Sequence, residues 1–148
     1  MKRQYIILAT VLLMLASADG ASALKWKVTA SVSVRVIPTQ GGNSNKTMAT
    51  GFHRLVLTEI TVADLLFPVR FRLNAGELHR DGDWTDGCST GWIWGWNATS
   101  AFCATNYTEN DCTSAYWEAW TWGQVQLHPA GGVKQAVDGP TFADCTCT

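Results

Sequence analysis

The 148-residue chain lacks the short motifs that mark common catalytic sites. It contains no G-x-S-x-G nucleophile turn, no H-E-x-x-H zinc helix and no glycine-rich phosphate loop. Its histidines, His53, His79 and His128, fall in separate segments, although Glu77, His79 and Asp81 alternate so that they would share one face of a strand. A general acid–base pair requires a defined geometry as well as suitable residues. We therefore expect a protein that is not an enzyme.

Basic clusters are also absent, and charged residues make up only 16% of the chain. Because nucleic-acid-binding proteins carry a basic patch, we expect no nucleic-acid partner. The charges are nevertheless segregated. Residues 24–80 carry eight basic and three acidic side chains, a net +5, whereas residues 81–148 carry one basic and eight acidic side chains, a net −7. The two halves either neutralise each other within one fold or attract the opposite halves of other subunits, which predicts salt-sensitive self-association.

Long apolar runs are missing except at the N-terminus. Lys2 and Arg3 precede an uncharged run over residues 4–18, and Ala21-Ser22-Ala23 supplies a small-x-small cleavage pattern. The run is shorter than the roughly 20 residues that span a bilayer. We predict a secretory signal peptide over residues 1–23 and no stable membrane span after its cleavage, an uncleaved anchor being the alternative. The expected location is secreted or extracellular, or periplasmic if the source is bacterial.

Cysteine is absent from the basic half. The five cysteines all lie in the acidic half, at Cys88, Cys103, Cys112, Cys145 and Cys147. No C-x-x-C pair is present, and an exported chain favours disulfides over zinc thiolates, so we expect two disulfides and one unpaired thiol. Fifteen connectivities satisfy that count. The preferred one joins Cys88 to Cys103, and Cys112 to Cys145 or Cys147.

Amphipathic helix patterns are lacking, and β patterns take their place. From residue 26 to residue 36 the even positions are apolar and the odd ones mostly polar, an alternation that predicts a strand. The expected strands cover 26–36, 48–61 with a break at Gly51, 65–73, 92–96, 115–127 and 133–137, with a tail that ends at Cys147. Turn residues cluster at 74–76 and 81–83, and a short helix is expected near 61–64.

No internal repeat or low-complexity linker divides the chain. Several strands with short, turn-rich connections are typical of a sandwich or barrel. We therefore predict an all-β protein, in which residues 24–148 form one antiparallel β-sandwich (or barrel) stapled by disulfides.

Tryptophan is the most abundant aromatic residue, and seven of the eight lie between Trp84 and Trp122. In an extended Gly91–Trp96 segment the three indoles would point to one side, because strand side chains alternate. An indole row either fills a core or offers a flat platform that stacks on sugar rings, with its N–H as a polar handle. The candidate ligand-binding residues are the platform Trp92, Trp94 and Trp96 and the flanking Trp84, Trp120 and Trp122.

Two further patterns involve oxygen ligands and glycans. Asp81, Asp83 and Asp86 are spaced somewhat as in a calcium loop, but the spacing is one residue off and no distal glutamate follows, so Ca²⁺ is a weak candidate and no other cofactor is expected. Three N-x-S/T sequons predict that Asn45, Asn97 and Asn106 lie on loops, and that the chain is a glycoprotein if its host modifies them.

The leading functional hypothesis is a secreted, non-catalytic binding module that recognises a carbohydrate, a cell-surface glycan or another surface polymer through exposed tryptophans. The alternative is a structural subunit of an extracellular fibre, coat or adhesive assembly, favoured by the charge segregation and the odd cysteine. A third hypothesis, a membrane-active β protein, rests only on the alternation from residue 28 to residue 36.

Overall fold

A computed structural model describes residues 25–38, 45–59, 69–110, 114–127 and 132–145. These residues form strands without any helix. The strands are β1 (Lys25–Pro38), β2 (Asn45–Glu59), β3 (Val69–Arg80), β4 (Asp83–Cys88), β5 (Ile93–Trp94), β6 (Ser100–Glu109), β7 (Ala115–Leu127) and β8 (Val133–Cys145). The predicted signal peptide (residues 1–23) and the helix near 61–64 lie outside the described residues.

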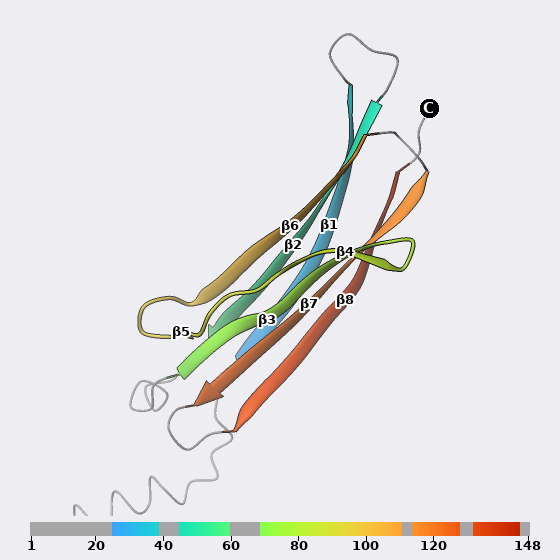
Figure 1. Cartoon of the computed structure of the whole chain (residues 1–148). Coiled ribbons are helices and arrows are strands. Elements are labelled where there is room, and N and C mark those ends of the chain that lie inside the picture. Colours follow the sequence, from blue (N-terminus) through green and yellow to red (C-terminus); the bar gives the residue numbers. More distant parts are fainter. Residues whose placement is uncertain (1–24, 39–44, 60–68, 111–113, 128–131, 146–148) are drawn as a thin grey trace, which may run out of the picture.

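The strands make two antiparallel sheets packed against each other. The three-stranded sheet has the order β1-β2-β6, and the five-stranded sheet has the order β4-β3-β7-β8, with the short β5 pairing with β3. In Figure 1 the long strands follow the long axis of an elongated molecule, with the two sheets as its layers. The prediction of an all-β antiparallel sandwich is confirmed.

The core forms where the alternating strands turn their apolar sides inward. Its main cluster draws on both sheets and consists of Val28, Leu55, Leu57, Val69, Phe71, Leu73, Ala101 and Val125. A second cluster joins the fully buried Trp117 to Ala49 and Leu78. Burial of each large side chain contributes about 1.5–3 kcal/mol. The basic and acidic halves of the sequence thus share one core.

His53 is a polar residue buried between the sheets, with no exposed surface. Its Nδ1 lies 2.8 Å from Thr121 Oγ1 on β7, and its Nε2 lies 3.0 Å from Thr105 Oγ1 on β6. A Cβ on Gly76 would lie 2.4 Å from the His53 ring, so the absence of a side chain there makes room for the imidazole. Both ring nitrogens are therefore satisfied, and the ring ties β2 to strands of both sheets.

Aspartates cap exposed backbone groups at both seams between the sheets. Asp138 on β8 accepts a hydrogen bond from the Ala30 amide of the edge strand β1 at 2.7 Å. Asp86 on β4 accepts one from the Asn106 amide of the other edge strand, β6, at 2.8 Å. Capped amides are not available to an added strand, a common protection of sheet edges.

One disulfide, Cys88–Cys103, joins the end of β4 to β6 and so links the two sheets, as predicted. Cys145 is buried and has no disulfide partner among the described residues; its Sγ lies 3.7 Å from Thr47 Oγ1. Cys112 and Cys147 lie outside the described residues, so the second predicted disulfide stays a prediction.

Replacing Cys88 and Cys103 together by serine is expected to lower the free energy of unfolding by about 3 kcal/mol, because the bridge closes a loop of 15 residues. For a chain of this size that corresponds to a drop in Tm of roughly 10 °C. Thermal unfolding followed by circular dichroism measures it. An unchanged Tm in the double variant would contradict the stapling role of this bridge.

Several predicted boundaries are wrong. Residues 74–76, predicted as a turn, lie inside β3, where a register shift between Leu73 and Ala75 absorbs the extra residue as a bulge. The predicted break at Gly51 is absent, since β2 pairs continuously through it. The segments 83–88 and 100–109 were not predicted as strands. The predicted short strand at 133–137 and the tail as far as Cys145 form one strand, β8.

Candidate functional site

The solvent side of the five-stranded sheet gathers the tryptophans of the acidic half. Val69, Phe71 and Leu73 of β3 point into the core, so the alternate residues point outward. Residues directly opposite each other on paired strands point to the same side. The members of this surface, called the tryptophan face below, are Trp84, Trp92, Trp94, Trp96, Trp120 and Trp122.

Strand pairing places four of the six tryptophans opposite particular residues of β3. Trp94 lies opposite Arg70, and Trp84 lies opposite His79. Between them, Trp122 and Trp120 of β7 lie opposite Ala75 and Glu77. At a rise of about 3.3 Å per residue, the stretch from Arg70 to His79 measures about 30 Å. The indoles are therefore distributed along an extended strip, the shape that suits a linear polymer.

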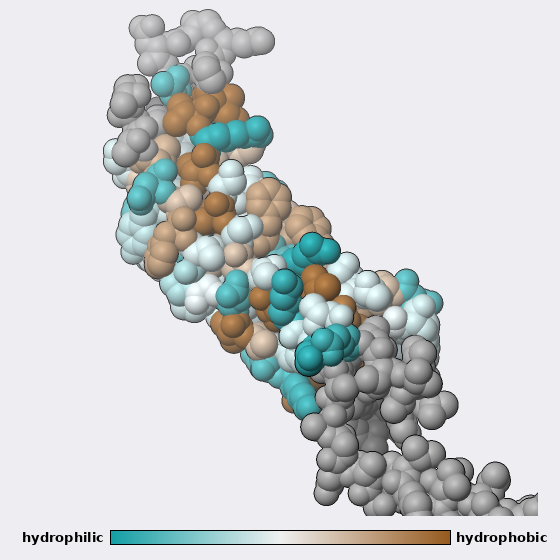
Figure 2. Space-filling view, turned by 180° about the vertical axis from the view of Figure 1, so that it is seen from behind, coloured by the Kyte–Doolittle hydropathy of each residue, from teal (hydrophilic) through white to brown (hydrophobic). Residues whose placement is uncertain are grey.

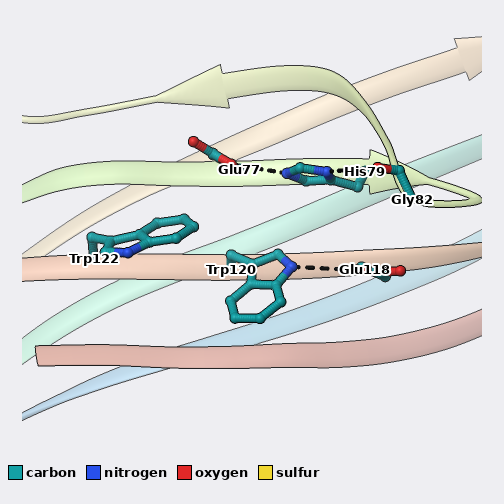
Figure 3. A pocket seen from close by; sticks show the side chains of 6 residues that line it. All are labelled: Glu77, His79, Gly82, Glu118, Trp120 and Trp122. Carbon is teal, nitrogen blue, oxygen red and sulfur yellow. Dashed lines mark hydrogen bonds and ion pairs between the residues drawn. The ribbon is translucent and has the colours of Figure 1, made fainter.

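An open pocket lies within this face, with a volume of about 290 Å³. Figure 3 shows its lining side chains projecting from two neighbouring strands, with Trp120 and Trp122 on β7. The complete lining is Glu77, His79, Gly82, Glu118, Trp120 and Trp122. The two indoles are nearly parallel, at an interplanar angle of 20° with centroids 5.8 Å apart. The volume is near the lower limit of small-molecule sites, about 300–1,000 Å³.

Hydrogen bonds fix the polar side chains of the pocket. The imidazole of His79 lies with Nε2 2.8 Å from Glu77 Oε2, and its Nδ1 lies 3.4 Å from the Gly82 carbonyl oxygen. Trp120 donates its indole N–H to Glu118 Oε2 at 3.3 Å. Each carboxylate is thereby held beside an aromatic or imidazole ring. Such an arrangement offers hydrogen-bond acceptors next to a flat apolar surface.

The backbone of β8 helps to place Trp120. Opposite Trp120 the β7–β8 register shifts, and Gly139 occupies the shifted segment with φ +118°, a value that favours glycine. A Cβ at this position would lie 2.6 Å from the Ala119 carbonyl oxygen and 3.1 Å from Trp120 Cα. The close approach of β8 therefore restricts the backbone that carries the indole.

The end of the face around the pocket is acidic. Glu77 and Glu118 line the pocket, and Asp81 and Asp83 flank Gly82. Partial desolvation, followed by the charge of Glu118, a side-chain hydrogen bond to Glu118 and the charges of Asp81 and Asp83, raises the pKa of the neighbouring Tyr116 above its usual value. Arg80 bonds to Glu109 of β6 and lies 3.4 Å from Asp81. The nearest arginine is therefore engaged with carboxylates of its own.

The opposite end of the face is basic. Arg70 and Arg72 donate from Nε to Gln126 and Gln124 of β7, each at 2.8 Å. Both guanidinium carbons lie 4.6 Å from the centroid of the Trp92 ring, a cation–π distance. Both arginines therefore pack on the ring of Trp92, which was predicted as part of an open platform.

The predicted Trp92–Trp96 strand is shorter in the structure. Only Ile93–Trp94 form β5, and residues 95–97 turn, with Asn97 N donating to the Trp94 carbonyl at 3.0 Å. The turn folds Trp96 back onto Trp94, with centroids 4.9 Å apart at 6°. Glycine at position 95 fits this geometry because its amide donates to the Val69 carbonyl at 2.7 Å and a Cβ would lie 3.2 Å from that oxygen. Trp92, Trp94 and Trp96 are therefore not a single straight row.

Exposure differs sharply among the indoles. Trp84 and Trp96 are 61% and 60% exposed, whereas Trp117 is fully buried. Trp84 is part of β4. The remaining members of the tryptophan face are half-buried, and Trp26 packs against the core. Both uses of indole that the sequence left open, core and surface, occur in this chain.

The acidic residues proposed as calcium ligands have structural partners. Asp81 Oδ1 accepts a hydrogen bond from the Tyr116 amide at 3.0 Å, and Asp86 caps β6. Across the described ranges no group of three histidine, cysteine or acidic side chains is arranged to hold a metal ion. Calcium binding by Asp81, Asp83 and Asp86 stays an untested prediction.

Of the three sequon asparagines predicted on loops, only Asn97 lies outside a strand. Asn97 is exposed in the turn after β5, and Asn45 is exposed at the first position of β2. Asn106, predicted on a loop, lies within β6, where its side chain accepts a hydrogen bond from Thr50 Oγ1 at 3.1 Å. Thr105, Tyr107 and Thr108 around it favour a strand, which explains the error.

The solvent side of the three-stranded sheet has a smaller aromatic feature. Phe52 and Phe102 stack there with centroids 6.3 Å apart, at 41% and 57% exposure. Figure 2, seen from behind, shows hydrophobic side chains reaching the surface at several separate places among polar ones. Indoles and paired carboxylates occur together only on the tryptophan face within the described part of the chain.

The fold and this face define a two-sheet antiparallel β-sandwich with an extended aromatic surface. No family model matches the chain, and no curated protein matches it. Among solved structures it is similar to the X-ray structure of Northeast Structural Genomics Consortium target SoR45, at a TM-score of 0.37 and 8% identity, over 81% of this chain and 86% of that one. That likeness carries no conclusion about function. Among the described residues no helix is long and apolar enough to cross a membrane.

Proposed function

We propose that the protein is a secreted, non-catalytic module that binds a carbohydrate polymer along the tryptophan face. The observation that carries this proposal is the placement of six indoles on one solvent-facing side of a sheet, around a pocket with two carboxylates. Indoles stack on the apolar faces of sugar rings. Carboxylates beside them accept hydrogen bonds from sugar hydroxyls, and charged acceptors make the stronger bonds.

The length of the face favours a polymer over a small ligand. A strip of about 30 Å offers contacts at several successive positions along β3. Exposed aromatic surface of this extent usually marks an interaction site. The disulfide between Cys88 and Cys103 is consistent with an oxidising compartment, which supports export by the proposed signal peptide.

Binding is tested by titrating the purified mature protein with neutral, acidic and amine-bearing oligosaccharides of two to six sugar units while tryptophan emission is recorded. We expect a saturable emission change with at least one class, and affinity that rises with chain length, because a longer oligomer reaches more indoles. No saturable change with any class would refute the proposed function.

Self-assembly through the same face is a second candidate function. The face has a basic end at Arg70 and Arg72 and an acidic end at Glu77 and Glu118, so two copies in opposite orientation have complementary charges. The exposed Phe142 and Val137 of β8 would add apolar contact. Light scattering at low salt distinguishes the candidates: a monomer that binds oligosaccharide supports the first, and a salt-sensitive oligomer that binds none supports the second.

A further inference from the structure

The pocket at the acidic end of the tryptophan face combines two recognition elements. Trp120 and Trp122 present nearly parallel indoles, and Glu77 and Glu118 lie at their sides. His79 bonds to Oε2 of Glu77, and the Trp120 indole N–H bonds to Oε2 of Glu118. The Tyr116 side chain is a further hydrogen-bond partner of Glu118. Glu77 Oε1 takes no part in the bond to His79, and the Glu77 side chain is 32% exposed, so it is accessible to a ligand in this open pocket.

The surrounding charge favours a cation over an anion. Four carboxylates, Glu77, Asp81, Asp83 and Glu118, belong to this end of the face. The positively charged Arg80 bonds to Glu109 on the other sheet and pairs with Asp81 at 3.4 Å, so neither pocket-lining carboxylate, Glu77 or Glu118, is its partner in these pairs. An acidic sugar would be repelled by these carboxylates, whereas an ammonium group would be attracted by both the carboxylates and the indole faces.

The shape of the aromatic surface distinguishes a cationic sugar from a simple quaternary ammonium ion. Small cations of that kind are held in aromatic cages. Here the two indoles lie nearly parallel, at 20°, on one strand and line an open pocket. A flat ring with an amine at its edge fits this surface better, since the ring stacks while the amine reaches a carboxylate.

We propose that this pocket binds a sugar unit that carries a free amine, a 2-amino-2-deoxyhexose of a cationic polysaccharide. The ring lies on the surface made by Trp120 and Trp122, and the ammonium group donates hydrogen bonds to Glu77 and Glu118. This inference rests on the proposed function and specifies its ligand class.

The test compares two oligomers that differ only at the amine: a β-1,4-linked glucosamine tetramer and its fully N-acetylated counterpart. Choline serves as a third probe, a cation without a sugar ring. We expect the amine tetramer to bind about tenfold or more tightly than the acetylated one, the size of one charge-assisted hydrogen bond. Isothermal titration at moderate salt measures all three, with the full mature protein.

Isosteric variants assign the preference to the pocket. Glu77→Gln and Glu118→Gln keep an oxygen acceptor for His79 and Trp120 but remove the charge, so we expect the preference for the amine to fall to near unity. Glu59→Gln is the matched control, because it removes one charge on the three-stranded sheet, where Glu59 pairs with Lys25. Trp120→Ala should weaken both tetramers together.

The outcomes separate the inference from the proposed function. Equal affinity for the two tetramers would overturn the amine preference and keep glycan binding. A preference lost equally in Glu59→Gln would mean non-specific charge attraction and overturn the inference. Binding of choline without binding of either tetramer would overturn both claims, and so would the absence of all binding.

Discussion

Replacing Trp120 by alanine is expected to weaken oligosaccharide binding by tenfold or more and leave the fold nearly intact. Stacking on one exposed aromatic side chain contributes about 1–3 kcal/mol in sites that bind flat rings. Trp120 is half-buried on the solvent side of β7 and lines the pocket, so its removal deletes a stacking surface without opening the core. Isothermal titration gives the affinity, and thermal unfolding reports the stability.

Trp117, three residues earlier on the same strand, provides the matched contrast. It is fully buried against Leu78 and Ala49, and Tyr107 packs on it at a centroid distance of 5.6 Å. Trp117→Ala should therefore lower the free energy of unfolding by about 3–5 kcal/mol. A loss of stability in Trp120→Ala as large as in Trp117→Ala would show that Trp120 belongs to the core. Full affinity in Trp120→Ala would show that this side of β7 does not bind the ligand.

Replacing His53 by alanine is expected to cost about 3–5 kcal/mol of stability. The change leaves a cavity between the sheets and removes the hydrogen-bond partner of both Thr105 and Thr121, two buried hydroxyls. His79→Ala is the control, because His79 lies on the solvent side of β3. Denaturant unfolding at neutral pH measures both variants, and a similar small loss in each would contradict the role of His53 in the core.

His53 also predicts how stability depends on pH. Burial lowers the pKa of His53 below its usual 6.5, an effect that a hydrogen bond from the imidazole to the Trp120 backbone and the charges of Asp86 and Glu77 oppose in part. The unfolded chain then binds the proton more readily than the folded one. The contribution of neutral His53 is full above about pH 6.5 and is lost as the pH falls toward the folded-state pKa.

The measurement compares unfolding free energies at about pH 8 and about pH 5.5 in the wild type and in His53→Gln, which cannot titrate. We expect the decrease toward acidic pH to be smaller in the variant, because the carboxylates common to both proteins still titrate. An equal decrease in both would show that His53 does not drive the acid sensitivity.

Elements with a strong local pattern could be predicted from the sequence. The alternation from residue 26 to residue 36 falls within β1, and the expected strand 115–127 is β7 with the same bounds. The Cys88–Cys103 disulfide was also predicted correctly. Local patterns suffice for such elements because side-chain alternation and short loop closure do not depend on distant parts of the chain.

Elements that depend on their neighbours could not be predicted. β4 contains Asp83, Asp86 and Gly87, residues typical of turns, and becomes a strand because β3 pairs with it. The pocket depends on the register of β3 against β7, including the bulge between Leu73 and Ala75. That register brings Glu77 beside Trp120, residues 43 positions apart, and no local signal contains it.

The sequence identified the tryptophans of the face, but their predicted arrangement was wrong. The spacing of Trp92, Trp94 and Trp96 is regular, but Gly95 turns the chain and two arginines pack on Trp92. Trp120 and Trp122, expected only to flank the platform, line the pocket. The contact between the arginines and Trp92 could not be predicted from the sequence. Both arginines lie on β3, twenty or more residues before Trp92, and the pairing of β3 with β5 brings them to its ring.

The central claim is that the tryptophan face binds a carbohydrate, and mapping the indole signals tests it most directly. The chain has eight tryptophans, and each indole N–H gives one signal in a proton–nitrogen correlation spectrum. Addition of a binding oligosaccharide should shift the signals of Trp120 and Trp122 and leave that of the buried Trp117 in place. Binding that leaves Trp120 and Trp122 unmoved, or shifts Trp117 most, would contradict the account.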